Sequence, residues 1–227
     1  EINPEIQPEQ GWNLEAGVRR RVINGLSAEL VLFRMDVRNL IVPRRTALDA
    51  FVGRNAGRTL HQGLEAYLRY EKELSQAWRL DGFLSYTMAQ YKFIDFVDEE
   101  LEADYSGNIL PGVPAQHLNA GLDIFHKSGA YLNSSFQAVG DMFLRDDNSV
   151  TAPGYTLLNA RGGWRKVIWQ NRLELDLYLG VNNVLDTKYA SMLLINAASF
   201  GGRAPRYFYP GLPRYLYGGV HLNWNLK

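Results

Sequence analysis

The sequence predicts an all-β protein, specifically a portion of an antiparallel, up-and-down transmembrane β-barrel. Three observations favour it: period-two alternation, segments long enough to cross a bilayer, and links that alternate between short and long. In Leu173–Asn182, every second residue is aliphatic. Successive side chains of a strand point to opposite sides, so this segment has one apolar face. Its 10 residues exceed the typical globular strand of about five or six and match the roughly 9–11 of a tilted membrane strand.

The same alternation predicts nine strands, each with apolar side chains at alternate positions and polar, charged or glycine residues between them. The first three are Trp12–Val18, Val31–Val37 and Gln62–Tyr70. The next three are Arg79–Tyr91, Leu118–Ile124 and Ala130–Gly140. The last three are Thr156–Trp164, Leu173–Asn182 and Tyr215–Leu226.

The links between these strands alternate in length. Short links are expected near Ile23–Ser27, Glu71–Gln76, His126–Gly129 and Lys166–Gln170. Long links are expected near Pro43–Leu60, Phe93–Ala115, Phe143–Gly154 and Asn183–Pro213. In an up-and-down sheet, all tight turns then lie at one end and all long loops at the other. Outer-membrane barrels have this asymmetry, with short periplasmic turns and long extracellular loops.

Aromatic residues and charge narrow the class further. Near predicted strand ends, where membrane barrels carry aromatic girdles, lie Trp12, Tyr86, Trp164, Tyr215 and Trp224. A formal net charge of zero gives no support to a nucleic-acid partner. Cysteine is absent, which excludes disulfides and thiolate metal sites. A soluble β-sandwich or lipocalin-like barrel also alternates apolar and polar faces, but strand length and loop asymmetry favour the membrane barrel.

Nine strands cannot close as an antiparallel barrel, because the first and the ninth run in the same direction. Single-chain bacterial barrels have even strand counts, and an open sheet edge in lipid leaves backbone groups unpaired. Residues 1–227 are therefore expected to form part of a larger barrel. The chain begins Glu1-Ile2-Asn3-Pro4, without Met or a signal peptide, so we expect a processed or excised piece.

Five short motifs precede predicted strands or lie in the last link. They are Asn3-Pro4-Glu5-Ile6-Gln7-Pro8-Glu9, Asn55-Ala56-Gly57-Arg58 with His61-Gln62-Gly63-Leu64-Glu65, Leu110-Pro111-Gly112-Val113-Pro114, Pro153-Gly154-Tyr155-Thr156-Leu157-Leu158-Asn159, and Val181-Asn182-Asn183-Val184-Leu185-Asp186-Thr187-Lys188-Tyr189 followed by Pro213-Arg214. In this order they cover almost the whole chain. Together they resemble the C-terminal part of the barrel of TonB-dependent outer-membrane receptors of the ferric-siderophore type.

The resemblance implies a barrel of about 22 strands in the outer membrane of a Gram-negative bacterium. It implies uptake of a ferric siderophore or similar nutrient, without a cofactor. The implied partners are outer-membrane lipid, lipopolysaccharide, an N-terminal plug domain and the energising TonB complex. The plug and the TonB-contacting box have no counterpart in this sequence, so we expect the piece alone not to be transport-competent. The chain also ends Trp224-Asn225-Leu226-Lys227 instead of in the family's terminal aromatic residue.

No catalytic or metal-binding constellation emerges. The four histidines, His61, His117, His126 and His221, have no ligand spacing, and no metal site is predicted. An outer-membrane enzyme would need a serine–histidine or carboxylate set facing one cavity, so we expect no enzyme. The alternative function is a structural or adhesion β-protein, either a small membrane barrel or a soluble β-sandwich, with no transport role.

Two loop segments are candidates for binding. The last link carries Arg203, Arg206, Tyr207, Tyr209 and Arg214. Arginine donors and tyrosine rings suit an anionic iron chelate, although packing among the long loops explains such residues equally simply. An acidic run comprises Asp95, Asp98, Glu99, Glu100, Glu102 and Asp104. A solvated loop is the simpler interpretation of this run. Cation binding, or metal-bridged contact with lipopolysaccharide phosphates, is the alternative.

Overall fold

In the computed structural model, the chain is described over residues 4–45, 51–98, 102–199 and 202–224. It forms one antiparallel sheet of nine strands in the order β1-β2-β3-β4-β7-β8-β11-β12-β15. The strands are β1 (Gln10–Ile23), β2 (Leu26–Arg45), β3 (Phe51–Glu73), β4 (Trp78–Asp95), β7 (Gln116–His126), β8 (Ala130–Val139), β11 (Tyr155–Ile168), β12 (Leu173–Asn182) and β15 (Tyr215–Trp224). Each pairs with its neighbours in sequence order, which confirms the predicted up-and-down sheet, and β1 and β15 form its open edges.

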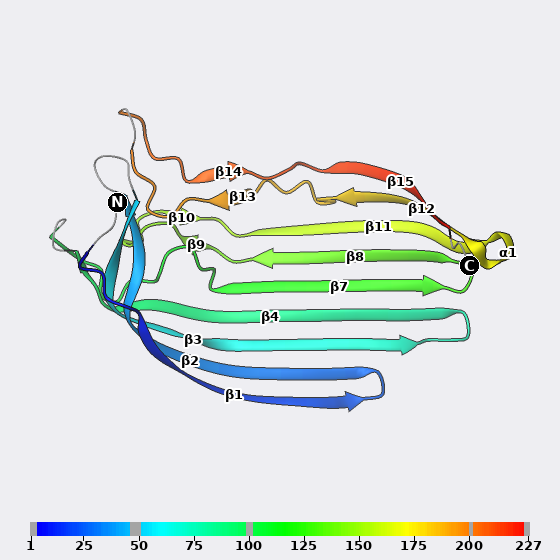
Figure 1. The fold of residues 1–227 in the computed structure, drawn as a ribbon, viewed down its shortest axis with the longest axis horizontal. Coiled ribbons are helices and arrows are strands. Elements are labelled where there is room, and N and C mark those ends of the chain that lie inside the picture. The colour runs from blue at the N-terminus through cyan, green and yellow to red at the C-terminus, as the bar shows by residue number, and fades with distance from the viewer. Residues whose placement is uncertain (1–3, 46–50, 99–101, 200–201, 225–227) are drawn as a thin grey trace.

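The two ends of the sheet differ, as Figure 1 shows. At the turn end, short connections join the strands, one of them through the four-residue helix α1 (Trp169–Arg172). At the loop end, three small ribbons lie within the long links: β5 (Val97–Asp98) with β6 (Ala103–Asp104), β9 (Met142–Phe143) with β10 (Thr151–Ala152), and β13 (Ala190–Leu193) with β14 (Phe208–Pro210). In the described part of the chain, no helix is long and apolar enough to span a membrane.

The long link expected at Pro43–Leu60 is wrong. Strand β2 runs to Arg45 and β3 begins at Phe51, and the two pair continuously through Pro43 opposite Gly53. Backbone hydrogen bonding does not need strict alternation of apolar and polar side chains, and Ala56 of β3 packs with Leu40 and Val42 of β2 in a buried cluster. The ladder therefore continues beyond the alternation that revealed it. Residues 46–50 lie outside the described residues.

Alternation divides the sheet into an apolar and a polar face. Leucine and valine side chains recur along the apolar face. One of them, Leu179, is 76% exposed. We define this face by Leu14, Leu32, Leu64, Leu122, Leu177 and Val220, and the polar face by Glu65, Asp123, Asn133, Arg161, Asp176 and Tyr217. An exposed apolar face of this extent needs a non-aqueous environment.

The apolar side chains form a band that runs obliquely across the strands. The row of Leu32, Leu64 and Met88 meets the polar Gln116 on β7. On β7, the band begins one step nearer the turn end, at Leu118, which stands opposite Tyr86. Tilted strands in a membrane barrel produce such an offset. Rows of paired residues run perpendicular to the strands, so they cross the plane of the bilayer at an angle, whereas the apolar band follows that plane.

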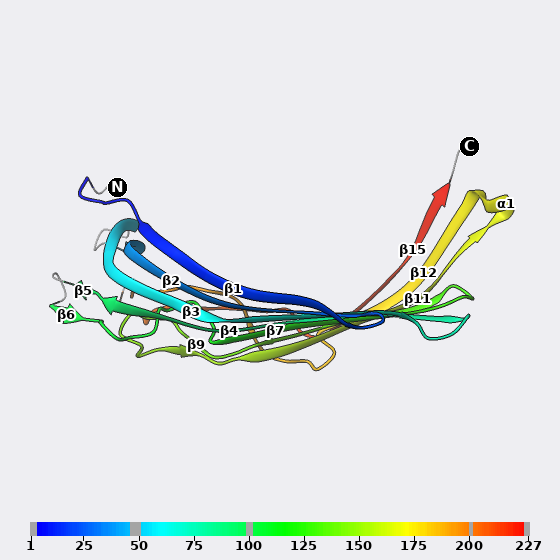
Figure 2. The same ribbon diagram turned by 90° about the horizontal axis from the view of Figure 1, so that it is seen from below.

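One of the aromatic positions expected at strand ends is wrong, because Tyr86 lies in the middle of β4. Tyr215 is the first residue of β15, as expected, but it lies on the polar face, where its hydroxyl accepts a hydrogen bond from Asn182 at 2.5 Å. Trp12 and Trp224 do lie near strand ends on the apolar face. The curved sheet leaves both faces open (Figure 2), and its buried apolar clusters lie at the loop end, in the long links and the strand ends beside them.

Candidate functional site

Aromatic rings on the polar face lie over glycines of the neighbouring strand. Tyr178 stands opposite Gly219, and a Cβ added to Gly219 would lie 2.5 Å from the tyrosine hydroxyl. Tyr131 stands opposite Gly163, whose added Cβ would lie 2.5 Å from its ring. Glycine is therefore required here because the space above it is occupied. The same arrangement places Tyr217 over Gly180 and Phe83 over Gly121.

A charged cluster on the polar face is centred on Asp176, which is 2% exposed. Its carboxylate accepts hydrogen bonds from the Tyr131 hydroxyl at 2.8 Å, from Arg165 Nη2 at 2.9 Å and from Arg161 Nη2 at 3.2 Å. The Arg161 guanidinium also lies 3.8 Å from the centroid of the Tyr178 ring. Two arginines share the Asp176 carboxylate, and the charge of Glu174, on the same face of β12, also acts on Arg165, so the two positive charges are matched by two carboxylates. Glu174, Asp176 and Tyr178 all lie on the polar face of β12.

The long loops are joined to one another by two asparagine side chains. Asn148 donates to the Ile109 carbonyl at 2.8 Å and accepts from the Ile109 amide at 2.9 Å. Asn196 donates to the Asp146 carboxylate at 3.0 Å and accepts from the Asp146 amide at 3.1 Å. Both asparagines have positive φ, 56° and 50°, a conformation that asparagine tolerates better than most residues. These bonds connect the loops β4–β7, β8–β11 and β12–β15.

Charged groups on the β9–β10 ribbon have opposite pKa shifts. Arg145 pairs with Asp147 at 2.9 Å, and this bond lowers the pKa of Asp147 to about 2. Burial raises the pKa of the neighbouring Asp146. The pKa of Arg145 is raised first by its hydrogen bond to Asp147 and then by its hydrogen bond to the Tyr207 oxygen, and the second bond joins this ribbon to the last loop.

A hollow of about 510 Å³ lies among the loop ribbons. Its walls are mostly apolar or aromatic, with Lys188 as the only cation among the described lining residues; other contributors include Met142, Tyr155, Tyr189, Leu193 and Phe208. The rings of Tyr155 and Tyr189 lie 5.1 Å apart. Such walls suit a ligand with aromatic surface and negative charge.

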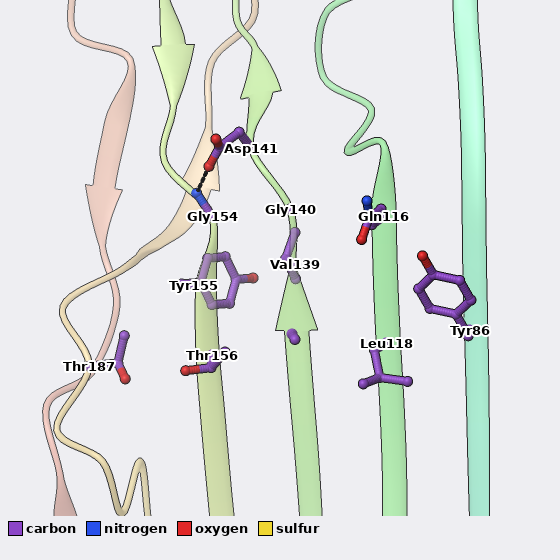
Figure 3. A pocket seen from close by; sticks show the side chains of 11 residues that line it. Tyr86, Gln116, Leu118, Val139, Gly140, Asp141, Gly154, Tyr155, Thr156 and Thr187 are labelled. Atoms are coloured by element: carbon purple, nitrogen blue, oxygen red, sulfur yellow. Dashed lines mark hydrogen bonds between the residues drawn. The ribbon is translucent and has the colours of Figure 1, made fainter.

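A second hollow, of about 720 Å³, lies at the loop-side ends of β7, β8 and β11, beside the middle of β4 (Figure 3). Asp141 accepts a hydrogen bond from the Gly154 amide across its upper edge, at 2.5 Å. Tyr86, Leu118 and Thr156 in its lining belong to the apolar face. This hollow therefore does not open on the polar face, and we take the loop hollow as the better ligand site.

The five ligand-binding candidates of the last loop have different surroundings. Tyr207 is 8% exposed and packs with Leu144, Ala152 and Ala197 in a loop cluster. Arg214 donates to the Val184 carbonyl at 3.3 Å and lies 3.9 Å from the Asp186 carboxylate. Arg214 is nevertheless exposed, as are Arg203, Arg206 and Tyr209. The sequence motifs include Lys188 and Tyr155, but sequence reasoning did not identify either as a ligand contact, because neither interrupts a pattern.

The last sequence motif closes the loop after β12. The Asn183 side chain accepts a hydrogen bond from the Thr187 amide at 2.9 Å and donates to the carbonyls of Thr187 and Leu212. The backbone φ of Asn183 is 51°. Asp186 accepts from the Arg214 amide at 3.0 Å. In the other motifs, Glu9 accepts from the Ile41 amide at 2.6 Å and Gly63 lies under the Phe33 ring. Asn3 lies outside the described residues.

The acidic run does not form a cation site in the described part of the chain. There, no group of three histidine or acidic side chains is placed to hold a metal ion. Asp98 is buried, and Asp104 accepts from the Ser106 amide at 2.9 Å. Glu99 and Glu100 lie outside the described residues.

Comparisons with known proteins agree with this geometry. Residues 2–184 match the family model described as TonB dependent receptor-like, beta-barrel. The ferric citrate transporter FecA is 23% identical, with a TM-score of 0.70 over 95% of this chain and 31% of that chain. The ferric yersiniabactin uptake receptor FyuA from Yersinia pestis is 18% identical, with a TM-score of 0.67 over 95% and 30%. The siderophore receptor PiuA from Acinetobacter baumannii is 18% identical, with a TM-score of 0.67 over 96% and 29%. The chain spans less than a third of the length of these structures.

Proposed function

The chain belongs to the TonB-dependent receptor β-barrel family, and from that premise we propose that it is the C-terminal barrel region of an outer-membrane receptor that takes up a ferric siderophore or a similar nutrient. The two-faced sheet is the observation that carries the proposal. Leu179 and its neighbours are exposed on one face, while Asp176 is buried among arginines on the other. The apolar face meets lipid, and the polar face lines the lumen.

The plug domain and the TonB complex are the partners of the whole receptor. The charged groups around Asp176, including Arg161 and Arg165, face the lumen, where a plug segment would lie. Strands β1 and β15 keep unpaired edges, which in lipid must be covered by further barrel strands. The piece alone is therefore not transport-competent.

The ligand is an anionic iron chelate with aromatic or apolar surface, held in the loop hollow. Lys188 supplies the positive charge and the paired rings of Tyr155 and Tyr189 supply the aromatic surface. Arg206 and Tyr209, both exposed in the same loop, provide further contacts at the entrance.

Binding of ferric catecholate and hydroxamate chelates to the full-length receptor tests this proposal. Replacing Lys188→Gln should weaken binding of an anionic chelate by about tenfold, the equivalent of one charge-assisted contact. The matched control is Lys166→Gln, which removes an exposed lysine at the turn end of β11. Equal effects of the two variants would exclude the loop hollow. Failure of the full-length receptor to bind any iron chelate would contradict the proposed nutrient class.

A further inference from the structure

The chain segment that carries Lys188 is fixed by hydrogen bonds on both sides of this residue. The Asn183 side chain bonds to both the amide and the carbonyl of Thr187, each at 2.9 Å. The Tyr189 carbonyl accepts a hydrogen bond from the Gly211 amide at 2.8 Å. The Thr187 carbonyl belongs to the planar peptide group that leads into Lys188, so its bond to Asn183 sets the direction in which the lysine side chain leaves the backbone.

A further bond of Asn183 connects this segment with the residues that precede β15. The same side-chain nitrogen donates to the Leu212 carbonyl at 3.1 Å. Leu212 follows Gly211, whose amide bonds to Tyr189, so the hydrogen bonds form a closed ring that includes the backbone of Lys188. The Tyr189 ring also lies over Gly211, where an added Cβ would come within 2.3 Å of ring atom Cζ. Lys188 and Tyr189 are therefore held in their place at the loop hollow.

Asn183 is also bonded to the strand that carries Tyr155, another residue of the loop hollow. The Asn183 backbone amide donates to Asn159 Oδ1 at 2.9 Å. Asn159 lies on β11, the strand that begins with Tyr155. Asn183 itself is only 4% exposed and is not among the described lining residues of the hollow. It therefore joins the segments that carry Tyr155 and Tyr189 without being available to a ligand.

The chemistry of this position requires asparagine. Its side-chain oxygen accepts one hydrogen bond and its side-chain nitrogen donates two, while the backbone has a φ of 51°. Aspartate would keep the acceptor and lose both donors. Glycine would keep the conformation and lose every side-chain bond.

We propose that Asn183 is a positioning residue of the loop hollow, which acts on an anionic ligand through Lys188 without touching the ligand. This inference rests on the proposed function. A lysine whose backbone is already fixed loses less freedom when a ligand binds, so the hydrogen bonds of Asn183 raise the affinity of the hollow for negative charge. A ligand without charge gains little from the placement of the lysine ammonium group.

A double-mutant cycle in the full-length receptor tests the coupling between the two residues. Asn183→Gly should weaken binding of an anionic ferric tris-catecholate about fivefold, because the ligand must then order the lysine segment. Lys188→Gln should weaken it about tenfold, and the double variant should bind about as weakly as Lys188→Gln alone. A neutral ferric tris-hydroxamate should bind Asn183→Gly and the wild type alike.

The matched control is Asn148→Gly. Asn148 has a similar φ of 56° and bonds to the amide and the carbonyl of Ile109, but it does not line the loop hollow in the described part of the chain. Its loss should leave chelate binding unchanged. Equal losses in Asn148→Gly and Asn183→Gly, equal losses for the anionic and the neutral chelate, or additive effects in the cycle would each overturn the proposal.

A second measurement needs no ligand. A nitroxide label on Lys188→Cys, in a full-length receptor without other cysteines, reports the mobility of this segment by electron paramagnetic resonance. The label should become more mobile in Asn183→Gly and stay unchanged in Asn148→Gly, and unchanged mobility in both would overturn the inference. If Asn183→Gly does not fold, Asn183→Asp replaces it here. A wild type that binds neither chelate contradicts the proposed function, whereas the label still decides whether Asn183 positions Lys188.

Discussion

The ring of Tyr217 lies directly over Gly180 on the neighbouring strand, so that a Cβ on Gly180 would come within 2.3 Å of ring atom Cζ. The ring thus occupies the volume that any larger residue at this position would need. Rings over glycines are a recognised way to cover exposed backbone in a sheet and to fix its register.

Replacing Gly180→Ala should therefore destabilise the barrel. Overpacking at a filled position costs about 1–3 kcal/mol, measured as a shift of the urea unfolding midpoint of the full-length receptor. Gly162→Ala is the matched control, because its added Cβ would have the Tyr131 carbonyl at 3.7 Å as its nearest neighbour. Equal losses in the two variants would show that the ring does not hold this volume.

Neutralising Asp176 should be more costly than neutralising an exposed carboxylate. The substitution Asp176→Asn removes the buried negative charge with which both Arg161 and Arg165 pair. Breaking a buried pair costs about 3–5 kcal/mol, which we reduce to about 2 kcal/mol because the Arg165 side chain is 52% exposed. The measurement is the free energy of unfolding in urea. Asp81→Asn, which removes the partner of exposed Arg79, should cost below about 1 kcal/mol.

Two variants of Asn183 separate its backbone conformation from its hydrogen bonds. Asn183→Gly keeps easy access to the φ of 51° but loses the bonds to Thr187 and Leu212. Asn183→Ala loses the bonds and also strains the backbone, so it should be the less stable by about 1 kcal/mol. Amide hydrogen exchange of residues 183–189 reads out the local effect. If Gly and Ala behave alike, backbone conformation does not limit this turn.

The Arg145–Asp147 pair predicts a pH dependence of stability. The folded-state pKa of Asp147 is about 2, below its ordinary 3.8, so its contribution is present above about pH 4 and is lost as the pH falls toward 2. The pair is partly exposed, so the contribution stays below about 1 kcal/mol. The difference in urea midpoint between the wild type and Asp147→Asn should shrink over this range.

Alternation allowed the sheet to be predicted from sequence. The predicted strand Leu173–Asn182 coincides with β12. The last predicted strand begins at Tyr215, and so does β15, which runs to Trp224. Both predictions depend on side chains sorted between an apolar and a polar face, which is a local property of the chain. The number of strands follows from the same property, and the structure confirms it.

The loop end could not be predicted in the same way. The extension of β3 back to Phe51 pairs with β2 where neither face is uniformly apolar. The bonds of Asn148 and Asn196 join loops far apart in sequence and leave no periodic signal. Tyr207 was proposed as a ligand contact, but its burial arises from packing between two loops, which a single segment does not encode.

The asparagine bonds have a mechanical consequence for access to the sheet from the loop end. Because Asn148 and Asn196 each join one loop to the next through two hydrogen bonds, no connected loop can swing outward without breaking a pair of bonds or carrying its neighbour. Rearrangement at this end is therefore concerted, because a molecule that displaces one loop must also move, or break its hydrogen bonds to, the loops joined to it.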